Sequence, residues 1–402
     1  MSKVRAKSAI IFLLAALLLV TLWVLLHFGR PAARSVAAVP PPAGAPRASR
    51  PAAKQPPTGV AADSAGPSAA QVCGHTELTI SDDVRVLNQL VGALSLEAGE
   101  RWLSALQNSG DLRARAAGLL LEGKLAGGAP LSPVAEANRE TIVQLAVGTS
   151  EPAVYAVALD MCASHPRARP GPECRQLSAQ RWTQLDPGNA VPWLLLAEDA
   201  HRRHDMAGEA DAFAHAAGAA KVDSYSDSIY AFAAAELPPD VTPLQRAYLA
   251  TEVIGVEAAV SDPHYAIAAR HCTADALRDA DVRQQCNALA ELLVSQAPDL
   301  LDQSVGKLLG TKLGWSAERI AQIAQQQDAM MEAIQELSPI GDSQSWSCTA
   351  VARLNAYLDQ RVLLGEVAAA NELLERSGAR IPEMAHKYRQ FLKAIRDANP
   401  HQ

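Results

Sequence analysis

The chain has 402 residues, of which 49% are hydrophobic and only 4% aromatic, and its formal net charge is −7 at pH 7. Residues 1–70 hold eight of the 36 basic residues but only one of the 43 acidic residues. The rest of the chain therefore carries 28 basic and 42 acidic residues, a net charge of −14. This acidic balance argues against nucleic acid as a partner.

The first 28 residues are typical of a membrane anchor. Three basic residues within 1–7 precede an apolar run from Ala9 to Leu26, in which Thr21 is the one polar residue. A helix of this length crosses the ~30 Å hydrocarbon core of a bilayer, whereas the apolar core of a cleaved signal spans ~7–15 residues. We expect a basic cytoplasmic tail at 1–7 and a transmembrane helix at 8–28. The alternative is a signal peptide that is cleaved near residues 35–37.

Residues 29–76 are expected to form a disordered linker rich in proline and alanine. Nine prolines occur between positions 31 and 70, and large apolar side chains are almost absent there. Such a segment buries too little apolar surface to fold. An extended, polyproline-like chain rises ~3.1 Å per residue, so this linker would reach up to ~120 Å.

Residues 77–402 are expected to form an all-α periplasmic repeat domain, because apolar residues recur three and four positions apart. One clear example is a helix expected over 316–337, opened by Ser316 as N-cap and followed by Pro339. Its expected apolar stripe consists of Ile320, Ile323, Met331, Ile334 and Leu337. A domain of this length and composition stacks helical hairpins into a solenoid or packs them as an irregular bundle.

The six cysteines point to an oxidising compartment, where disulfides persist. Basic residues are slightly more numerous before the apolar run than after it, which places the N-terminus in the cytoplasm. The Ala/Arg/Pro-rich composition suggests a bacterium. We therefore expect a single-pass protein of a bacterial inner membrane with its bulk in the periplasm.

Two segments about 110 residues apart resemble one another. Tyr155 precedes Cys162 by seven residues, and Tyr265 precedes Cys272 by the same number. A second cysteine and a Gln-x(1–2)-Pro motif then follow in the same order, at Cys174 and Gln184–Pro187 and at Cys286 and Gln296–Pro298. We interpret these matches as a duplicated helical hairpin of about 45 residues. Each cysteine pair would join the end of the first helix to the start of the second.

This duplication predicts the disulfides Cys162–Cys174 and Cys272–Cys286, which close short loops and stabilise the fold by roughly 3 kcal/mol each. The remaining cysteines are Cys73 and Cys348. They pair with each other by elimination, or Cys73 links two copies of the chain as a homodimer. No Cys-x-x-Cys motif occurs, so we expect neither a metal site nor a cofactor.

Residues 185–217 carry a known repeat pattern. An Asp186-Pro187 turn opens the segment, Trp193 lies on the expected first helix, and Ala210 and Ala217 lie on the second. This pattern resembles one tetratricopeptide repeat, although Ala200 stands where that family has tyrosine. A fainter second unit spans 350–374.

The resemblance implies helical hairpins whose first helices line a groove for a partner's peptide. By position, the groove residues would be Val191, Leu194, Glu198, His201 and Arg202. The alternative is that these positions are ordinary solvated positions on a packed bundle, since a groove needs at least ~3 stacked repeats.

Motifs for nucleophilic hydrolysis, phosphate binding, dinucleotide binding and zinc proteolysis are absent from the sequence. We therefore expect no catalytic residues and a membrane-tethered interaction or assembly module that binds a protein or peptide of the envelope. The alternative is an envelope hydrolase that acts on peptidoglycan or peptides. A catalytic cleft would bring acidic residues from different helices together with raised pKa values.

Overall fold

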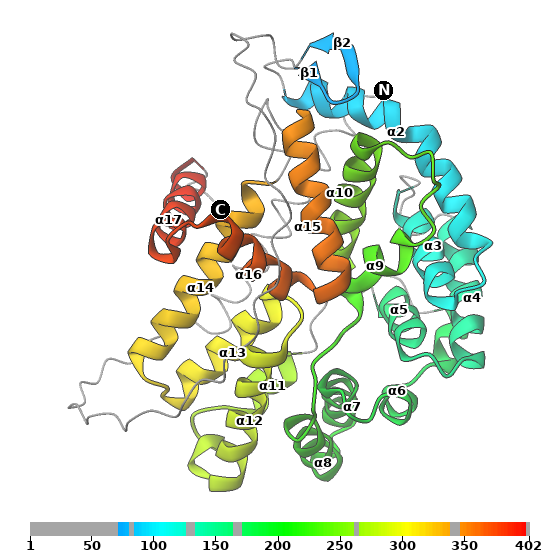
Figure 1. Ribbon diagram of the computed structural model, residues 1–402. Coiled ribbons are helices and arrows are strands. Elements are labelled where there is room, and N and C mark those ends of the chain that lie inside the picture. The colour runs from blue at the N-terminus through cyan, green and yellow to red at the C-terminus, as the bar shows by residue number, and fades with distance from the viewer. Residues whose placement is uncertain are drawn as a thin grey trace, which may run out of the picture. The chain divides into compact units, whose positions relative to one another are not determined.

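The computed structural model describes residues 71–79, 84–125, 133–163, 171–260, 265–337 and 346–398 (Figure 1). The expected cytoplasmic tail, the expected transmembrane helix at 8–28 and most of the expected linker lie outside these residues. Among the described helices, none is both long and apolar enough to cross a membrane. Residues 71–402 cluster as one structural unit.

The expectation of an all-α domain is confirmed for the described residues, which contain sixteen α-helices and one small β-hairpin. The helices are α2 (Val84–Gln107), α3 (Leu112–Leu125), α4 (Pro133–Gly148), α5 (Pro152–Ala163), α6 (Ala179–Leu185), α7 (Ala190–Arg202), α8 (Met206–Ala217), α9 (Ile229–Ala234), α10 (Pro243–Val260), α11 (Ala266–His271), α12 (Ala280–Gln296), α13 (Leu300–Leu313), α14 (Ala317–Gln335), α15 (Cys348–Leu364), α16 (Glu366–Ser377) and α17 (Ile381–Ala398). Short 3₁₀ turns are η1 (Pro172–Gln176), η2 (Ser226–Ser228) and η3 (Ala276–Arg278).

The β-hairpin corrects the expected end of the linker. Strands β1 (Gln71–Val72) and β2 (His75–Thr79) pair antiparallel, with Gly74 at φ +80° in the tight turn between them. Val72 is 1% exposed, so its side chain anchors the hairpin in the core. Residues 71–76, which were expected to belong to the linker, are therefore part of the helical unit, because burial of one valine holds a segment that looks polar in sequence.

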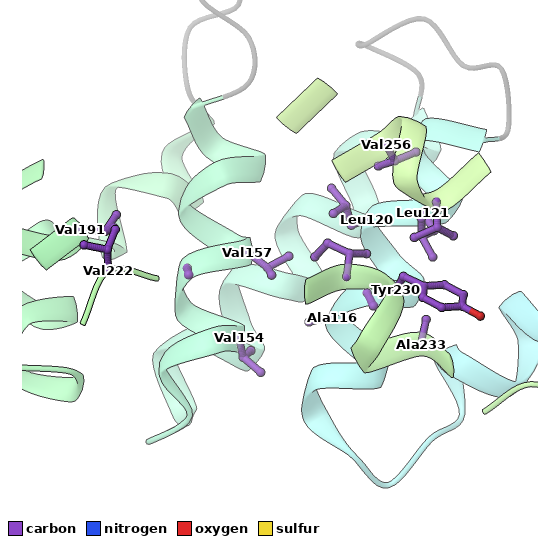
Figure 2. Close-up of a cluster of buried hydrophobic side chains, with 14 of the residues drawn as sticks. Ala116, Leu120, Leu121, Val154, Val157, Val191, Val222, Tyr230, Ala233 and Val256 are labelled. Atoms are coloured by element: carbon purple, nitrogen blue, oxygen red, sulfur yellow. The ribbon is translucent and has the colours of Figure 1, made fainter. Parts of the chain in front are cut away.

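The main core lies where α3 is covered by α5 on one side and by α9 and α10 on the other (Figure 2). Leu120 and Leu121 of α3 are at most 1% exposed and point toward these neighbours (Figure 2). Helix α2 packs on α3 and α10, and α15 packs on α9 and α10. These contacts join residues from the start, middle and end of the domain into one core.

A smaller second core, here called the C-terminal core, is formed by α14, α16, α17 and the first residue of α13. Its buried members are Leu300, Ala329, Met330, Ala333, Ala370, Leu374, Met384 and Ala385. Helix α13 belongs to both cores, since Leu300 lies in the C-terminal core while Val305 and Leu309 lie in the main core. The start of α13 is therefore one place where the two cores meet, and α16 is another, since Ala369 lies in the main core and Ala370 in the C-terminal core.

Helix α14 begins where the sequence predicts, but its buried face is rotated. Ser316 is the N-cap and accepts a hydrogen bond from the Arg319 backbone N–H at 3.2 Å. The most buried apolar residues of the helix are Ala329, Met330 and Ala333, whereas only Leu337 of the expected stripe is buried and its other members are partly covered. The cause is that α14 is packed between α16 and α17 and so buries two faces.

Replacing Ser316 by alanine is expected to lower the free energy of unfolding by about 1 kcal/mol, because the first turn of α14 loses its side-chain acceptor. Urea unfolding of the full chain in mild detergent measures this change. Ser316→Asp restores an acceptor and serves as the control. An alanine variant as stable as the aspartate variant would contradict this role of Ser316.

The duplication is larger than the sequence motifs suggested. The first residues of α4 and α10, Pro133 and Pro243, are 110 residues apart. The N-caps of α7 and α13, Asn189 and Asp299, have the same spacing. The helices α3–α8 thus recur in the same order as α9–α14, although individual helices differ in length. We interpret residues 112–217 and 222–335 as two tandem units.

Candidate functional site

All six cysteines are paired within the chain. The bonds are Cys73–Cys348, Cys162–Cys174 and Cys272–Cys286. The last two join the cysteines that the duplication predicted, and they link the end of α5 to the turn η1 and the end of α11 to α12. Because Cys73 is bonded to Cys348, no free cysteine is present for the alternative of a disulfide-linked homodimer.

The predicted groove on the tetratricopeptide-like segment is wrong for its apolar members. Val191 and Leu194 are 5% and 0% exposed, because α7 packs against both α6 and α8. Glu198 pairs with Arg270 of α11 at 3.3 Å, and Arg202 pairs with a neighbouring aspartate on its own helix. The two apolar residues are therefore core positions, Glu198 joins α7 to α11, and Arg202 is paired within α7, so these residues line no common groove.

The fifth predicted groove residue, His201, belongs to a small polar contact between the two tandem units. Its Nδ1 lies 2.9 Å from the Glu209 carboxylate of α8, and His271 Nδ1 of the second unit lies 3.9 Å from the same carboxylate. Glu209 is 6% exposed, and His271 stacks on Phe213. Burial lowers the pKa of His271 against the opposing effect of Glu209. The contact thus joins α7 and α8 to α11.

A cluster of carboxylates from four separate segments lies where the two cores meet, and we call it the acidic junction. Its six carboxylates are Asp223, Asp227, Glu257, Asp299, Asp302 and Glu366. They come from the segment before α9, from α10, from the start of α13 and from the start of α16. Residues more than 140 positions apart in sequence thus meet at one place.

Glu257 forms a buried ion pair with the guanidinium of Arg361 in the junction. Arg361 of α15 lies 2.7 Å from the Glu257 carboxylate, and the two side chains are 7% and 3% exposed. The other Glu257 oxygen accepts the Tyr230 backbone N–H at 2.7 Å, and Arg361 also donates to the Asp227 carbonyl oxygen at 3.4 Å. This pair therefore connects α10, α15 and the start of α9.

Asp299 and Asp302 form a carboxyl pair at the first turn of α13. Asp299 is the N-cap and accepts the Asp302 backbone N–H at 2.7 Å. The Tyr265 hydroxyl of α11 donates to Asp302 Oδ1 at 2.6 Å. Asp302 Oδ2 is buried and receives no hydrogen bond from any donor that the structure describes. The Asp299 carboxyl that faces it can donate only when it carries a proton.

The start of α16 is held to the start of α13 by two further bonds. Glu366 accepts the Leu300 backbone N–H at 3.1 Å, and the Val367 backbone N–H donates to the Pro298 carbonyl at 3.0 Å. Gly365, at φ +80°, makes the turn between α15 and α16 that brings Glu366 into this position. The α13 N-terminus is thus capped from both sides by carboxylates, as helix N-termini favour.

Burial raises the pKa of most carboxyls in the junction. It raises the pKa of Asp223 to about 6 and those of Glu257 and Asp302 to about 7. Burial, reinforced by repulsion from Asp302 and Asp227, holds the pKa of Asp299 well above its usual range. For Glu257, the attraction of Arg361 opposes burial but does not cancel it. The pair Asp299 and Asp302 therefore shares a proton near neutral pH.

The matching positions of the first tandem unit lack these charges. The residues 110 positions earlier are Asn189 for Asp299, Pro192 for Asp302 and Val147 for Glu257. Asn189 still caps its helix, by accepting the Val191 backbone N–H. The fold thus forms this helix start without acids at these three positions, although Asn189 there donates to the Asp186 carboxylate at 2.9 Å. Acids that a fold does not require are candidates for a functional role.

Metal binding is not supported at the junction or elsewhere in the described part of the chain, where no group of three or more suitable side chains could hold an ion. What the junction can do is take up and release protons, since burial raises the pKa of Asp223 to about 6 and those of Glu257 and Asp302 to about 7.

Sequence reasoning missed the acidic junction because its members are separated by long stretches of chain. A local signal was present only at Asp299 and Asp302, whose spacing before an apolar run marks a helix start. Comparing the two repeats, in which Asn189 occupies the position that matches Asp299, would have singled out Asp299.

Comparison with known proteins adds no assignment. No protein-family model, no curated protein and no solved structure matches this chain.

Proposed function

We propose that the chain is a non-catalytic, membrane-tethered interaction module of the bacterial envelope, with its helical body in the periplasm. The observation that supports this proposal is that the ionisable clusters of the described body are engaged in contacts between helices. Several large apolar side chains remain exposed on the helices themselves. They are Val86, Leu96, Val134, Val147, Met206, Leu363, Leu364, Ile381 and Phe391.

The test is site-specific photocrosslinking with the full chain in its native membrane. Crosslinkers replace Met206 and Leu363, whose exposed fractions are 67% and 74%. The matched control replaces Arg278, whose side chain is 82% exposed and polar. We expect an adduct of defined mass with one envelope protein from an apolar position and none from the control. Equal, diffuse labelling from all three positions would contradict the proposal.

A hydrolase of peptidoglycan or peptides is the second candidate, and the convergence of acids with raised pKa values favours it. Asp302 is 3% exposed and bonded to Tyr265, so a substrate would need the junction to open. Release of soluble fragments from peptidoglycan by the purified chain, and its loss in Asp302→Asn, would support hydrolysis. Absence of release by the wild type would reject it for that substrate.

A further inference from the structure

Several bonds between the C-terminal core and the main core lie at the first turn of α13. Leu300 lies in the C-terminal core, while its backbone N–H is bonded to Glu366 of α16. Two residues later, Asp302 is bonded to Tyr265, the N-cap residue of α11 in the main core. Whatever disturbs this turn therefore disturbs the attachment of α16, and with it the packing of α14 and α17.

Almost every charged group that faces this turn is negative. Asp302 is repelled by Asp227 and Asp223 from the segment before α9, and Asp299 is repelled by Glu366 from α16. Of the cations nearby, Arg361 is paired with Glu257 of α10, and Lys221 is shared between Asp223 and Asp186. Ionising both Asp299 and Asp302 would therefore place two uncompensated charges next to each other, with Asp302 Oδ2 lacking a donor.

We propose that Asp299 and Asp302 form a proton-dependent latch between the two cores. When the pair holds a proton, Asp299 donates to Asp302 Oδ2 and the start of α13 stays bonded to α11 and α16. When the proton leaves, repulsion separates the two carboxylates and α16 loosens from α13. Opening uncovers the C-terminal core, whose methionines Met330 and Met384 adapt readily to apolar partners. The latch itself does not depend on the proposed function. Only the binding of a partner to the opened C-terminal core rests on that function.

The direction of the pH effect follows from proton linkage. An unfolded aspartate has a pKa near ~4, and burial raises the pKa of Asp302 in the closed state to about 7. The closed state therefore binds more protons than the open state between these values, so opening becomes easier as pH rises. For one such group, the opening equilibrium increases about tenfold between pH 6 and pH 8.

Hydrogen exchange of the full chain, followed by mass spectrometry, tests the latch. After correction for intrinsic exchange, amides of α16 are expected to exchange about tenfold faster at pH 8 than at pH 6. Asp299→Asn keeps the cap, as Asn189 does in the first unit, and supplies a permanent N–H donor to Asp302. Its α16 amides are expected to be equally protected at both pH values. Asp302→Asn supplies an amide N–H donor to the Asp299 carboxylate instead. Its α16 amides are also expected to be equally protected at pH 6 and pH 8.

The matched control is Asp205→Asn, the same substitution at the exposed N-cap of α8, where Asp205 accepts the Gly208 backbone N–H at 2.9 Å. This variant is expected to retain the tenfold pH effect on α16. The latch is overturned if the wild type shows equal protection at pH 6 and pH 8. It is also overturned if both asparagine variants keep the wild-type pH dependence.

Discussion

Replacing Cys73 and Cys348 together by serine is expected to lower the free energy of unfolding by up to about 5 kcal/mol. The bond spans 275 residues, and on the chain-entropy model a cross-link restricts the unfolded chain more as its loop lengthens. It also joins the β-hairpin to the first residue of α15 (Figure 1). Urea unfolding of the full chain in mild detergent, followed by tryptophan fluorescence, measures the change.

The matched control for this prediction is the serine double variant of Cys162 and Cys174, whose bond spans only 12 residues. Its expected cost is smaller, roughly 3 kcal/mol. Hydrogen exchange should also show faster exchange in residues 71–79 only when the long-range bond is absent. If both double variants lose the same stability and leave the hairpin equally protected, the long-range bond does not have the assigned role.

Arg361→Met is expected to destabilise the protein by about 3–5 kcal/mol, because it leaves the Glu257 carboxylate buried without its counter-charge. Glu257 is 2% exposed, and its pKa is raised by burial, so the cost grows as pH rises through about 7. The same urea titration, performed at pH 6 and pH 8, measures both the loss and its pH dependence.

The double variant Arg361→Met with Glu257→Gln is expected to recover most of this loss. The glutamine keeps an oxygen for the Tyr230 backbone N–H but carries no charge. The control is Arg246→Met, since Arg246 pairs with Asp359 at the surface, where the side chains are 27% and 56% exposed. That change should cost less than about 1 kcal/mol. Failure of the double variant to recover stability would assign the loss to packing of the arginine.

Features that depend on neighbouring residues could be predicted from the sequence. The spacing of Tyr155 and Tyr265 to their cysteines located the duplication, and Ser316 marked the start of α14 as an N-cap. Such signals arise from bonds within a few residues, so they are visible along the chain. The two short disulfides follow the same logic, since their cysteines lie only 12 and 14 residues apart.

Features that depend on packing could not be predicted in this way. Val191 and Leu194 match a repeat pattern in which first helices line a groove, yet in this chain α6 and α8 bury them. Arg361 looks like an ordinary residue of an amphipathic helix, and nothing near it in sequence shows that Glu257 is its partner. The acidic junction exists only because α10, α13, α15 and α16 meet, and that meeting is a property of the folded chain.

The location of the body in an oxidising compartment is the claim on which the proposed function most depends, and the state of the six cysteines tests it directly. Intact cells that make the full chain would be treated with a membrane-permeant alkylating reagent, after which the protein is digested without reduction and mapped by mass spectrometry. The account predicts no alkylated cysteine and three linked peptide pairs, Cys73–Cys348, Cys162–Cys174 and Cys272–Cys286. Six alkylated cysteines in a folded, protease-resistant chain would contradict it and would place the body in the cytoplasm.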